Sequence, residues 1–494
     1  MPKITGSPVG WEGGPKRVVR LPALIATARF AGFGDTVEHR DYRSLSFWHD
    51  TAGEALEPRA PLSGEAAVDV AIVGAGYTGL WTAYYLCEAA PGLRIALVEA
   101  EIAGFGASGR NGGWCLGNLA GLDNHLDDPR TREAGTRLQR ALFESVAEVE
   151  RVCEREAIDC HWARGGSINL ATSEAHRTLL LSELEDARER GIGEADLRWL
   201  PPEECRARVR SQPNLGGLFL AHCAALHPLR LVRGLARAVE RRGAAIFERS
   251  PALAIAPGRV ATRGGALRAR HVVRATEAYT GSLSGHGRTL LPMHSVMVAT
   301  EPLPETVWKE IGLDRRETFA DPRRVVIYGQ RTADDRMAFG TRGAYFFGSA
   351  LRDRFSDAAY AQVQRTLESL FPVLRGCRIS HRWGGALGIP RDWRPAVGLD
   401  PATGLAFAGG YVGEGVAASN LAGRTLADLI LGRQTGRTAL PWVGGPPPAW
   451  EPEPLRWIGV SLVRRLAESL DAAELAGRRA HPLLERVFET FVRK

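Results

Sequence analysis

Three glycines and one acid are spaced as a nucleotide-binding turn requires. Gly74, Gly76 and Gly79 follow a β-branched run and lead directly into an apolar helical run, and Glu99 ends a second apolar run twenty residues later. The first glycine permits a tight turn, the second lets backbone N–H groups approach a pyrophosphate, and the third allows the helix to pack on the strand. Glu99 is placed to accept hydrogen bonds from adenosine ribose hydroxyls. The pattern predicts a dinucleotide at the start of a helix, where negative charge is stabilised.

Two further glycine-rich segments can place backbone donors against a bound ring or phosphate. Segment 108–113 is small, polar and glycine-rich, and Arg110 and Asn111 add side-chain donors to it. Segment 409–415 precedes an apolar helix whose start lacks a capping side chain at Gly415. Such a helix start has free N–H groups that stabilise negative charge. The alternative interpretation of the first segment is a surface loop, and that of segment 409–415 is a plain strand-to-helix turn.

Together these motifs resemble those of the glycine oxidase, sarcosine oxidase and D-amino-acid oxidase superfamily of FAD enzymes. Within it the chain is most similar to the γ-glutamylputrescine oxidase-like amine oxidases, over roughly Ser46 to Trp457. The resemblance implies FAD, with segment 409–415 at the flavin pyrimidine edge. The predicted cofactor-binding residues are Gly74, Ala75, Gly76, Tyr77, Thr78, Gly79, Glu99, Ala100, Gly106, Ala107, Ser108, Arg110, Asn111, Gly112, Gly113, Gly410, Gly413, Glu414, Gly415 and Val416.

The resemblance also implies that the FAD is bound non-covalently. Trp383 stands at about the place where sarcosine oxidases carry the linking cysteine, and Cys377 lies six residues earlier. Arg110 and Asn111 stand where some dehydrogenases carry a linking histidine.

Oxidation of an amine by flavin moves a hydride from the carbon that bears nitrogen, and water hydrolyses the resulting imine. Since the cofactor carries this chemistry, no catalytic triad or carboxylate pair is required. The resemblance implies oxidation of a small amine or amino acid, with O2 or an electron carrier as acceptor. Lys309 does not match the lysine by which some relatives activate O2. A flavin dehydrogenase of a non-amine substrate and a tRNA-modifying flavoprotein are the alternatives.

Candidates for the substrate pocket are polar or aromatic side chains near these motifs. Arg342 can hold a carboxylate through its planar fork, and a structural salt bridge explains it equally well. Trp383 can wall the flavin or pack in the core. No catalytic residue is assigned, and the pocket candidates are Trp114, Arg342, Tyr345, His381, Trp383, Arg391 and Tyr411.

Several charged or titratable residues have no clear place in this scheme. Arg274 and Glu277 stand where relatives carry an apolar residue and an asparagine or glycine, so they bring two charges to the expected FAD-binding face. The Glu414 carboxylate would oppose negative charge on reduced flavin, and we expect its side chain to turn outward. His227 precedes Pro228 in a turn, and a structural role is expected for it.

Apolar periodicity predicts an α/β protein in which a Rossmann-like FAD-binding domain is interleaved with an α+β substrate domain on a mostly antiparallel sheet. A strand is expected over 160–172, and the C-terminal repeat of Ile458, Leu462, Leu466 and Leu470 is expected to dock on the body. The predicted boundaries are 1–67 for a partly disordered N-terminal extension, 68–158, 216–280 and 381–435 for the FAD-binding domain, 159–215 and 281–380 for the substrate domain, and 436–494 for a proline-rich linker and C-terminal helices.

The composition limits the binding partners and the cellular compartment that we expect. The net charge of +7 comes from arginines spread along the chain rather than gathered in one basic run, so no nucleic-acid partner is expected. No run is long and apolar enough for a membrane span, and no metal-ligand spacing is present. The seven scattered cysteines include no C-x-x-C, which favours a reducing, cytoplasmic compartment. We expect a monomer or homodimer that acts on a small molecule.

Overall fold

The computed structural model describes residues 40–478 and 482–492. The disorder predicted for the start of the chain concerns residues that lie outside this described part, apart from Arg40. Segment 46–53, which resembles a segment of relatives, packs as expected, because Phe47 and Trp48 are buried.

One sheet has a parallel core of the kind that binds dinucleotides. Its strands are β1 (Gly64–Val73), β2 (Ile95–Val98), β8 (Ala245–Phe247), β9 (Ala252–Ala256), β10 (Arg259–Thr262), β11 (Gly265–Arg274), β17 (Ala396–Leu399) and β18 (Leu405–Gly409). The main order is β17-β18-β11-β1-β2-β8, in which β18 to β8 are parallel and β17 is antiparallel. The strands β1 and β2 both lie inside this order, and their buried apolar residues are those expected for strands covered on both faces.

A second sheet is mostly antiparallel. Its strands are β4 (Ser167–Leu170), β5 (Leu197–Leu200), β6 (Gly217–Leu220), β12 (Leu291–Thr300), β13 (Thr318–Asp321), β14 (Ile327–Arg331), β15 (Met337–Ala344) and β16 (Ile379–Ile389). The order is β16-β12-β15-β14-β13-β4-β6-β5, and only the β13–β4 pair is parallel. A small sheet joins β3 (Trp114–Leu116) to β7 (Cys223–Ala225). The predicted fold class is thereby confirmed, whereas the strand expected over 160–172 is limited to Ser167–Leu170.

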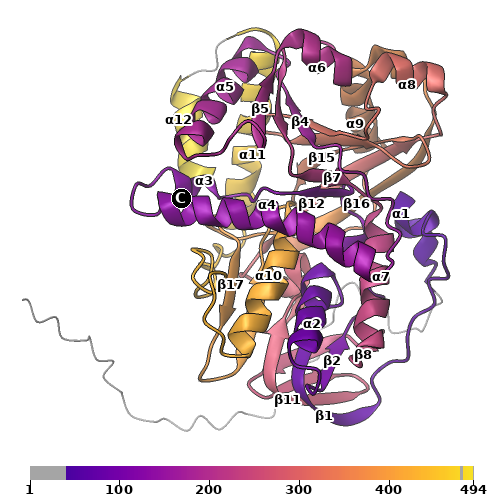
Figure 1. Cartoon of the computed structure of the whole chain (residues 1–494), viewed down its shortest axis with the longest axis vertical. Helices are drawn as coiled ribbons and strands as arrows, with labels where there is room; N and C mark the ends of the chain where they lie inside the picture. The colour runs from indigo at the N-terminus through magenta and orange to yellow at the C-terminus, as the bar shows by residue number, and fades with distance from the viewer. Residues whose placement is uncertain (1–39, 479–481, 493–494) are drawn as a thin grey trace, which may run out of the picture. The chain divides into compact units, whose positions relative to one another are not determined.

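Helices complete both parts of the structure (Figure 1). They are α1 (Phe47–Asp50), α2 (Tyr77–Ala89), α3 (Asp123–Leu126), α4 (Arg132–Arg155), α5 (Glu174–Glu189), α6 (Pro202–Arg208), α7 (Pro228–Arg241), α8 (Glu305–Ile311), α9 (Asp357–Leu370), α10 (Gly415–Ile430), α11 (Leu455–Leu475) and α12 (Pro482–Val492). Helix α2 contacts α7 and α10, and α9 contacts β12 and β15. His227 caps α7, since its Nδ1 accepts a hydrogen bond from Arg230 N–H, so its structural role is confirmed.

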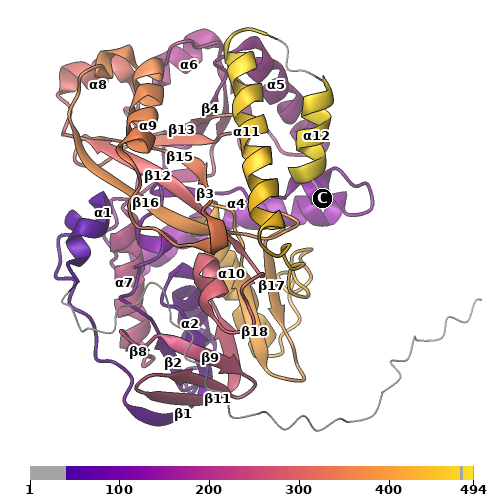
Figure 2. The ribbon, with the colours of Figure 1, turned by 180° about the vertical axis from the view of Figure 1, so that it is seen from behind.

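The C-terminal helices α11 and α12 lie side by side (Figure 2) and dock differently from the prediction. Ile458 and Leu462 are 52% and 55% exposed, so they do not form the docking face. Leu470 is buried, and the adjacent Asp471 accepts hydrogen bonds from the backbone N–H groups of Arg324 and Val325. Polar contacts to the β13–β14 loop therefore fix this end of α11.

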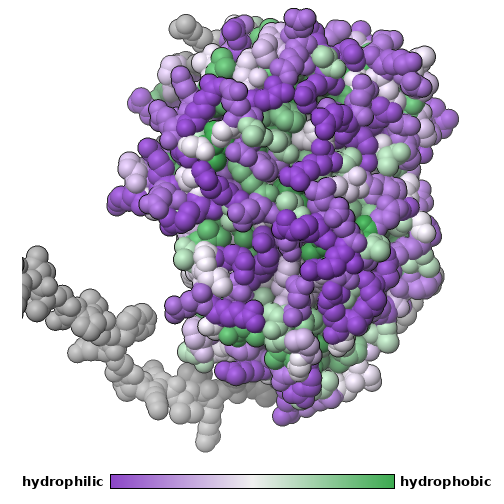
Figure 3. All heavy atoms as spheres, viewed as in Figure 1, coloured by the Kyte–Doolittle hydropathy of each residue, from purple (hydrophilic) through white to green (hydrophobic). Residues whose placement is uncertain are grey.

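One face of the molecule carries mainly polar side chains. Figure 3 shows one face that is largely hydrophilic, with apolar residues in scattered small areas. Among the described residues, no helix combines the length and the apolar character needed to cross a bilayer.

Candidate functional site

The first glycine turn has no room for side chains. Gly74 has a φ of +105°, and a Cβ there would lie 2.5 Å from the carbonyl oxygen of Ala275. A Cβ on Gly79 would lie 2.0 Å from the carbonyl oxygen of Gly74. Helix α2 thus approaches the end of β1 as closely as glycine allows.

Ser108 joins this turn to the second glycine-rich segment. Helix α2 begins at Tyr77, and its N-cap residue Gly76 supplies no side-chain cap. Tyr77 N–H donates to Ser108 Oγ at 2.9 Å, and a Cβ on Gly76 would lie 2.9 Å from the same oxygen. The positive end of the helix and the narrow glycine backbone form a cradle that a larger residue would fill, which fits a pyrophosphate.

Glu99 follows β2 and is already bound to the backbone. Its Oε2 accepts from Ala75 N–H at 2.8 Å and its Oε1 from Glu101 N–H at 3.1 Å. Each carboxylate oxygen can accept a further hydrogen bond, so a ribose hydroxyl still has a partner here. Burial raises the pKa of Glu99 to about 7, although the two backbone N–H groups oppose this effect. The adjacent Ala100 is half-buried.

Asn111 shapes the second segment from within. Its Nδ2 donates to the carbonyl oxygens of Ala107 and Ser108 at 3.0 and 3.1 Å, and its Oδ1 accepts from Gly113 N–H at 2.8 Å. The amide donors that we expected to face a ligand are therefore used by the loop itself. Residues of this loop would contact a cofactor mainly through their backbone.

Arg110 is 1% exposed and lies over the ring of Phe105, with its Cζ atom 4.4 Å from the ring centroid. Its Nε donates to the carbonyl oxygen of Phe105 at 2.8 Å, and its Nη1 donates to Asp353 Oδ1 at 2.6 Å. Asp353 also binds Arg40. The Arg110 guanidinium is thus fixed at the loop, and its Nη2 has no hydrogen-bond partner among the described residues.

Gln330 on β14 is a site residue that the sequence analysis did not single out. Its Nε2 donates to the carbonyl oxygens of Gly112 and Gly113 at 2.6 and 2.9 Å, and its side chain is fully buried. A Cβ on Gly113, which has a φ of +74°, would lie 2.1 Å from that nitrogen. The sequence offers one signal for Gln330: it is a polar residue in a strand that is otherwise expected to be buried.

Several buried polar atoms around segment 108–114 have no hydrogen-bond partner in the described part of the chain. They are His49 Nε2, Arg110 Nη2, Trp114 Nε1 and Gln330 Oε1. His49 belongs to this group because its ring lies 3.1 Å from the Cβ position of Gly109. Buried polar groups are almost always paired in folded proteins. Donors and an acceptor gathered here fit the N–H, C=O and phosphate groups of FAD.

Glu277 anchors the third glycine-rich segment. Its Oε2 accepts from Gly410 N–H at 2.8 Å and its Oε1 from Tyr411 N–H at 3.2 Å. Cβ atoms on Gly388 and Gly409 would lie 2.9 and 3.0 Å from Oε2, so the carboxylate is closely enclosed. Burial raises its pKa to about 7. The role that the sequence left open is therefore the positioning of segment 409–415.

Arg274 lies at the end of β11 beside Glu277. Its Nη1 donates to Thr280 Oγ1 at 3.1 Å, and its Cζ atom lies 5.5 Å from the centroid of the Phe407 ring. Burial lowers the pKa of Arg274 to about 10, while the charge of Glu277 opposes this shift. The opposite charges of Arg274 and Glu277 thus stabilise each other at the end of β11.

Helix α10 begins at Gly415, and its N-cap residue Glu414 makes no capping hydrogen bond. This open helix start was predicted. The expected outward orientation of Glu414 is wrong, because its Oε2 is buried and has no hydrogen-bond partner among the described residues. Burial raises the pKa of Glu414 to about 7, and the charge of Arg342 opposes this shift. The third glycine-rich segment thus holds a partly buried carboxyl group, which also accepts a backbone hydrogen bond from Ala120.

Arg342 on β15 reaches the third glycine-rich segment from the second sheet. Its Nη1 donates to the carbonyl oxygen of Val412, and a Cβ on Gly413 would lie 3.1 Å from Nη1. Trp114 and Tyr328 form an edge-to-face pair nearby, with ring centroids 6.1 Å apart. The Tyr328 ring lies 2.8 Å from the Cβ position of Gly112. Arg342 therefore lies at the third glycine-rich segment, close enough to Glu414 and Tyr328 for their charges to act on one another.

Four other pocket candidates are engaged elsewhere. Tyr345 OH donates to Glu453 Oε1 at 2.5 Å, and Tyr411 OH pairs with Thr78 Oγ1 at 3.0 Å. Arg391 binds Glu451 at 2.9 Å. Trp383 is buried and donates from Nε1 to the carbonyl oxygen of Arg110 at 3.0 Å, so it supports the loop from the core side.

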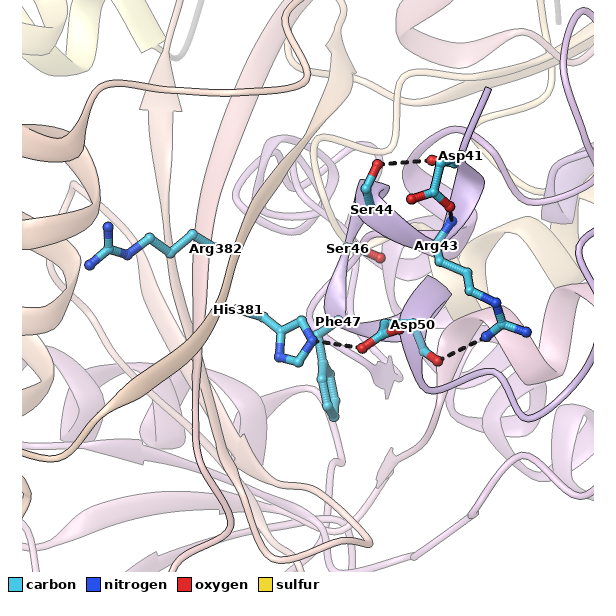
Figure 4. A pocket seen from close by; sticks show the side chains of 8 residues that line it. All are labelled: Asp41, Arg43, Ser44, Ser46, Phe47, Asp50, His381 and Arg382. Carbon is cyan, nitrogen blue, oxygen red and sulfur yellow. Dashed lines mark hydrogen bonds and ion pairs between the residues drawn. The ribbon is translucent and has the colours of Figure 1, made fainter. Parts of the chain in front are cut away.

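His381 lies in a separate surface pocket near α1 (Figure 4). Its Nε2 is 3.1 Å from Asp50 Oδ2, and its Nδ1 is 2.9 Å from Ser380 Oγ. His381 therefore does not join Arg342 and Glu414. The pocket is lined by Asp41, Arg43, Ser44, Ser46, Phe47, Asp50, His381 and Arg382.

Comparison with known proteins places this architecture in context. The DAO family, described as FAD dependent oxidoreductase, matches residues 69–429. The chain is 30% identical to a probable oxidoreductase OrdL of Haemophilus influenzae, over 78% of this chain and 88% of that protein. It is 29% identical to a gamma-glutamylputrescine oxidoreductase of Escherichia coli, over 78% of this chain and 89% of that protein. A solved structure of glycine oxidase from Geobacillus kaustophilus has the same fold, with a TM-score of 0.63 at 23% identity, over 75% of this chain and 96% of that one.

Proposed function

The chain belongs to the DAO family of FAD-dependent oxidoreductases, and from that premise we propose that it oxidises a C–N bond of a small amine or amino acid. The observation that carries the proposal is the match over 78% of this chain to a gamma-glutamylputrescine oxidoreductase. The family match over residues 69–429 includes all three glycine-rich segments. The site geometry agrees, because its polar groups suit binding and orientation rather than nucleophilic attack.

The cofactor would be held by the residues whose geometry fits it. The glycine turn and the start of α2 would bind the pyrophosphate, and Glu99 would accept the ribose hydroxyls. Segment 108–114 would lie along the ring system, with Arg110 and Gln330 supplying side-chain partners. The open start of α10 would face the pyrimidine edge. When bound, FAD supplies the acceptor for the hydride.

The protein's own residues would orient the substrate and exclude water. Arg342 has a rigid planar guanidinium, which suits a carboxylate or another anionic group on the substrate. Trp114 and Tyr328 offer an aromatic wall that removes water from the reacting carbon. The hydride leaves that carbon, and water then hydrolyses the imine after product release.

We further propose a cytoplasmic enzyme that acts as a monomer or homodimer and passes electrons to O2 or a carrier. All seven cysteines are free, and six of them are buried, which fits a reducing compartment. Lys309 is 73% exposed and pairs with Glu305, so it is not a candidate for oxygen activation.

An anaerobic spectral titration tests the function. Purified yellow protein is mixed with polyamines, γ-glutamylated amines, N-methyl amino acids, D-amino acids and aminophosphonates, and bleaching of the flavin by one of these classes is the expected result. Bleaching by a hydroxy acid or a tRNA, with none by any amine, would contradict the proposal. Admission of air then separates an oxidase from a dehydrogenase. Acid precipitation should leave the yellow colour in the supernatant, whereas a yellow pellet would point to attachment at Cys377.

A further inference from the structure

The four carbonyl oxygens of residues 110–113 are all held by side chains from outside the loop. Trp383 Nε1 on β16 donates to the first of them at 3.0 Å, and Trp48 Nε1 on α1 donates to the second at 2.8 Å. The amide nitrogen of Gln330 on β14 donates to the third and the fourth. Three elements that are distant in sequence thus fix the peptide planes of this stretch.

The carbonyl oxygen that Trp48 holds belongs to the peptide unit between Asn111 and Gly112. In a trans peptide the C=O and N–H groups point in opposite directions, so this bond also sets the direction of the Gly112 N–H. The N–H groups on either side are used within the loop, because Asn111 N–H donates to the carbonyl oxygen of Ala107 at 3.0 Å and Gly113 N–H to Asn111 Oδ1 at 2.8 Å. Gly112 N–H has no hydrogen-bond partner among the described residues, so it remains for a ligand.

The indole ring of Trp48 has little freedom to move. Its side chain is buried, and it packs edge to face on the rings of Trp383 and His227, with centroids 6.3 and 5.0 Å away. A Cβ on Gly113 would lie 3.2 Å from the Trp48 ring. The two indoles therefore support each other where both donate to the loop.

Helix α1 is also joined to β16 by two further contacts. The centroid of the Phe47 ring lies 6.1 Å from that of Trp383, and Asp50 Oδ2 lies 3.1 Å from His381 Nε2 (Figure 4). Helix α1 lies outside residues 69–429, over which the chain matches the DAO family. A segment outside the family match thus supplies one of the donors that orient the loop.

The groups that the loop leaves for a ligand are mostly donors. Arg110 Nη2 and Trp114 Nε1 are buried and have no partner in the described part of the chain, and the Gly112 N–H adds a backbone donor. A hydrogen bond accepted by a carbonyl polarises its peptide unit and strengthens the N–H of that unit as a donor. Reduced flavin carries more negative charge than oxidised flavin, so fixed donors that face it favour the reduced form.

From this arrangement we infer that Trp48 is a positioning residue of the flavin site, which orients the peptide between Asn111 and Gly112 so that the Gly112 N–H donates to the flavin ring and makes the ring easier to reduce. Trp383 acts in the same direction, because it supports the Trp48 ring and holds the preceding carbonyl. The inference rests on the placement of segment 108–114 along the flavin ring under the proposed function. It goes beyond that function by assigning to α1 a part in setting the reduction potential.

The reduction potential of the flavin in the holoenzyme tests the inference. It is measured by slow chemical reduction in the presence of a reference dye of known potential, so no substrate is needed. The variants are Trp48→Phe and Trp383→Phe, each of which keeps an aromatic ring and removes one N–H donor. The matched control is Trp308→Phe, because Trp308 is also buried and its Nε1 donates to the carbonyl oxygen of Asp335 at 3.2 Å in the core beside the second sheet.

We expect Trp48→Phe to lower the ratio of reduced to oxidised flavin at a fixed potential about tenfold, which is about 30 mV for a two-electron couple. Trp383→Phe should shift the ratio in the same direction. Trp308→Phe should keep the wild-type potential, although thermal unfolding should show a loss of stability similar to that of the other two variants, since each loses one buried hydrogen bond.

A wild-type potential in Trp48→Phe, or an equal shift in Trp308→Phe, would overturn the inference. If Trp48→Phe is isolated without flavin, the potential of Trp383→Phe decides, and a wild-type value there has the same meaning.

The inference and the proposed function fail separately. A wild-type potential in both variants, together with reduction of the flavin by an amine, removes the role of Trp48 and leaves C–N oxidation standing. A lowered potential in both variants, without reduction by any amine or amino acid, keeps the role of Trp48 and removes the proposed reaction.

Discussion

At the scale of single residues, we expect cofactor binding to depend more on the space that glycines leave open than on strong contacts. Gly76 is the clearest case, since a Cβ there would already lie 2.9 Å from Ser108 Oγ. Ser108 cannot withdraw freely, because it accepts the hydrogen bond of Tyr77 N–H.

Gly76→Val should therefore yield folded but colourless protein. The branched side chain would occupy the cradle and displace Ser108. The flavin content after purification is measured by absorbance, and circular dichroism confirms the fold. Gly92→Val is the matched control, because nothing lies within 4 Å of that Cβ position. A yellow Gly76→Val protein would show that the pyrophosphate lies elsewhere.

Glu99→Ala should weaken FAD binding by about 1.5–3 kcal/mol, the range for hydrogen bonds to a charged group. The variant loses the acceptors for the ribose and also the partner of Ala75 N–H in the glycine turn. Equilibrium dialysis measures the affinity. Glu185→Ala removes an exposed carboxylate and serves as the control. Unchanged affinity in Glu99→Ala would mean that Glu99 does not contact the cofactor.

Glu277 should make stability depend on pH in the direction opposite to an ordinary salt-bridged carboxylate. Its pKa in the folded state is raised to about 7 by burial, from 4.5. The folded state therefore binds the proton more tightly, and this contribution is complete below about pH 4.5 and is lost as pH rises through 7. Relative to Glu277→Gln, the wild type should lose roughly 1–3 kcal/mol of unfolding free energy between pH 5 and 8. Urea titrations at each pH measure this difference, and parallel pH curves would contradict the assignment.

At the scale of elements, the second sheet directly contacts the loop that we propose binds the cofactor. Gln330 from β14 donates to two consecutive carbonyl oxygens of segment 112–113. Gln330→Leu keeps the volume and removes both donors, so two buried carbonyls lose their partner. FAD affinity should fall by about 1–3 kcal/mol. Gln362→Leu on the exposed face of α9 is the control, and equal flavin retention in the two variants would show that β14 plays no part in cofactor binding.

The elements that the sequence predicts best are those with local signals. The turn at Gly74 to Gly79 and the open start of α10 depend on residues adjacent in the chain, and both appear as predicted. Gln330, the anchoring by Glu277 and the inward position of Glu414 depend on partners distant in sequence. Periodicity carries no information about such partners. The docking of α11 was mispredicted for the same reason, because apolar spacing alone does not show that Asp471 makes the decisive contacts.

At the scale of the whole molecule, the C-terminal helices reach the substrate side of the site through one loop. Asp471 binds the N–H groups of Arg324 and Val325, and the next residue, Val326, accepts a hydrogen bond from Arg342 N–H at 3.2 Å. The position of α11 is thereby coupled to the strand that carries Arg342.

Asp471→Ala should loosen this coupling. Two backbone N–H groups lose their acceptor, which costs about 1–3 kcal/mol of unfolding free energy. The KM for the substrate should rise while FAD binding stays unchanged, because the glycine-rich segments are untouched. Steady-state kinetics and flavin content measure the two effects. Glu468→Ala, on the exposed face of α11, is the control, and a normal KM in Asp471→Ala would show that α11 does not influence the substrate side.

The interleaved strand order also has a consequence for biosynthesis. β18 pairs with β11 in the parallel sheet, yet β11 ends at Arg274 and β18 begins only at Leu405. At ordinary translation rates this interval lasts roughly 7–26 s. During that time β11 has an unpaired edge, which is a template for aggregation. Since we propose that the start of α10 at Gly415 binds the cofactor, the site is complete only after this helix has left the ribosome. We therefore expect the yield in a host cell to depend on chaperone supply more than on flavin supply.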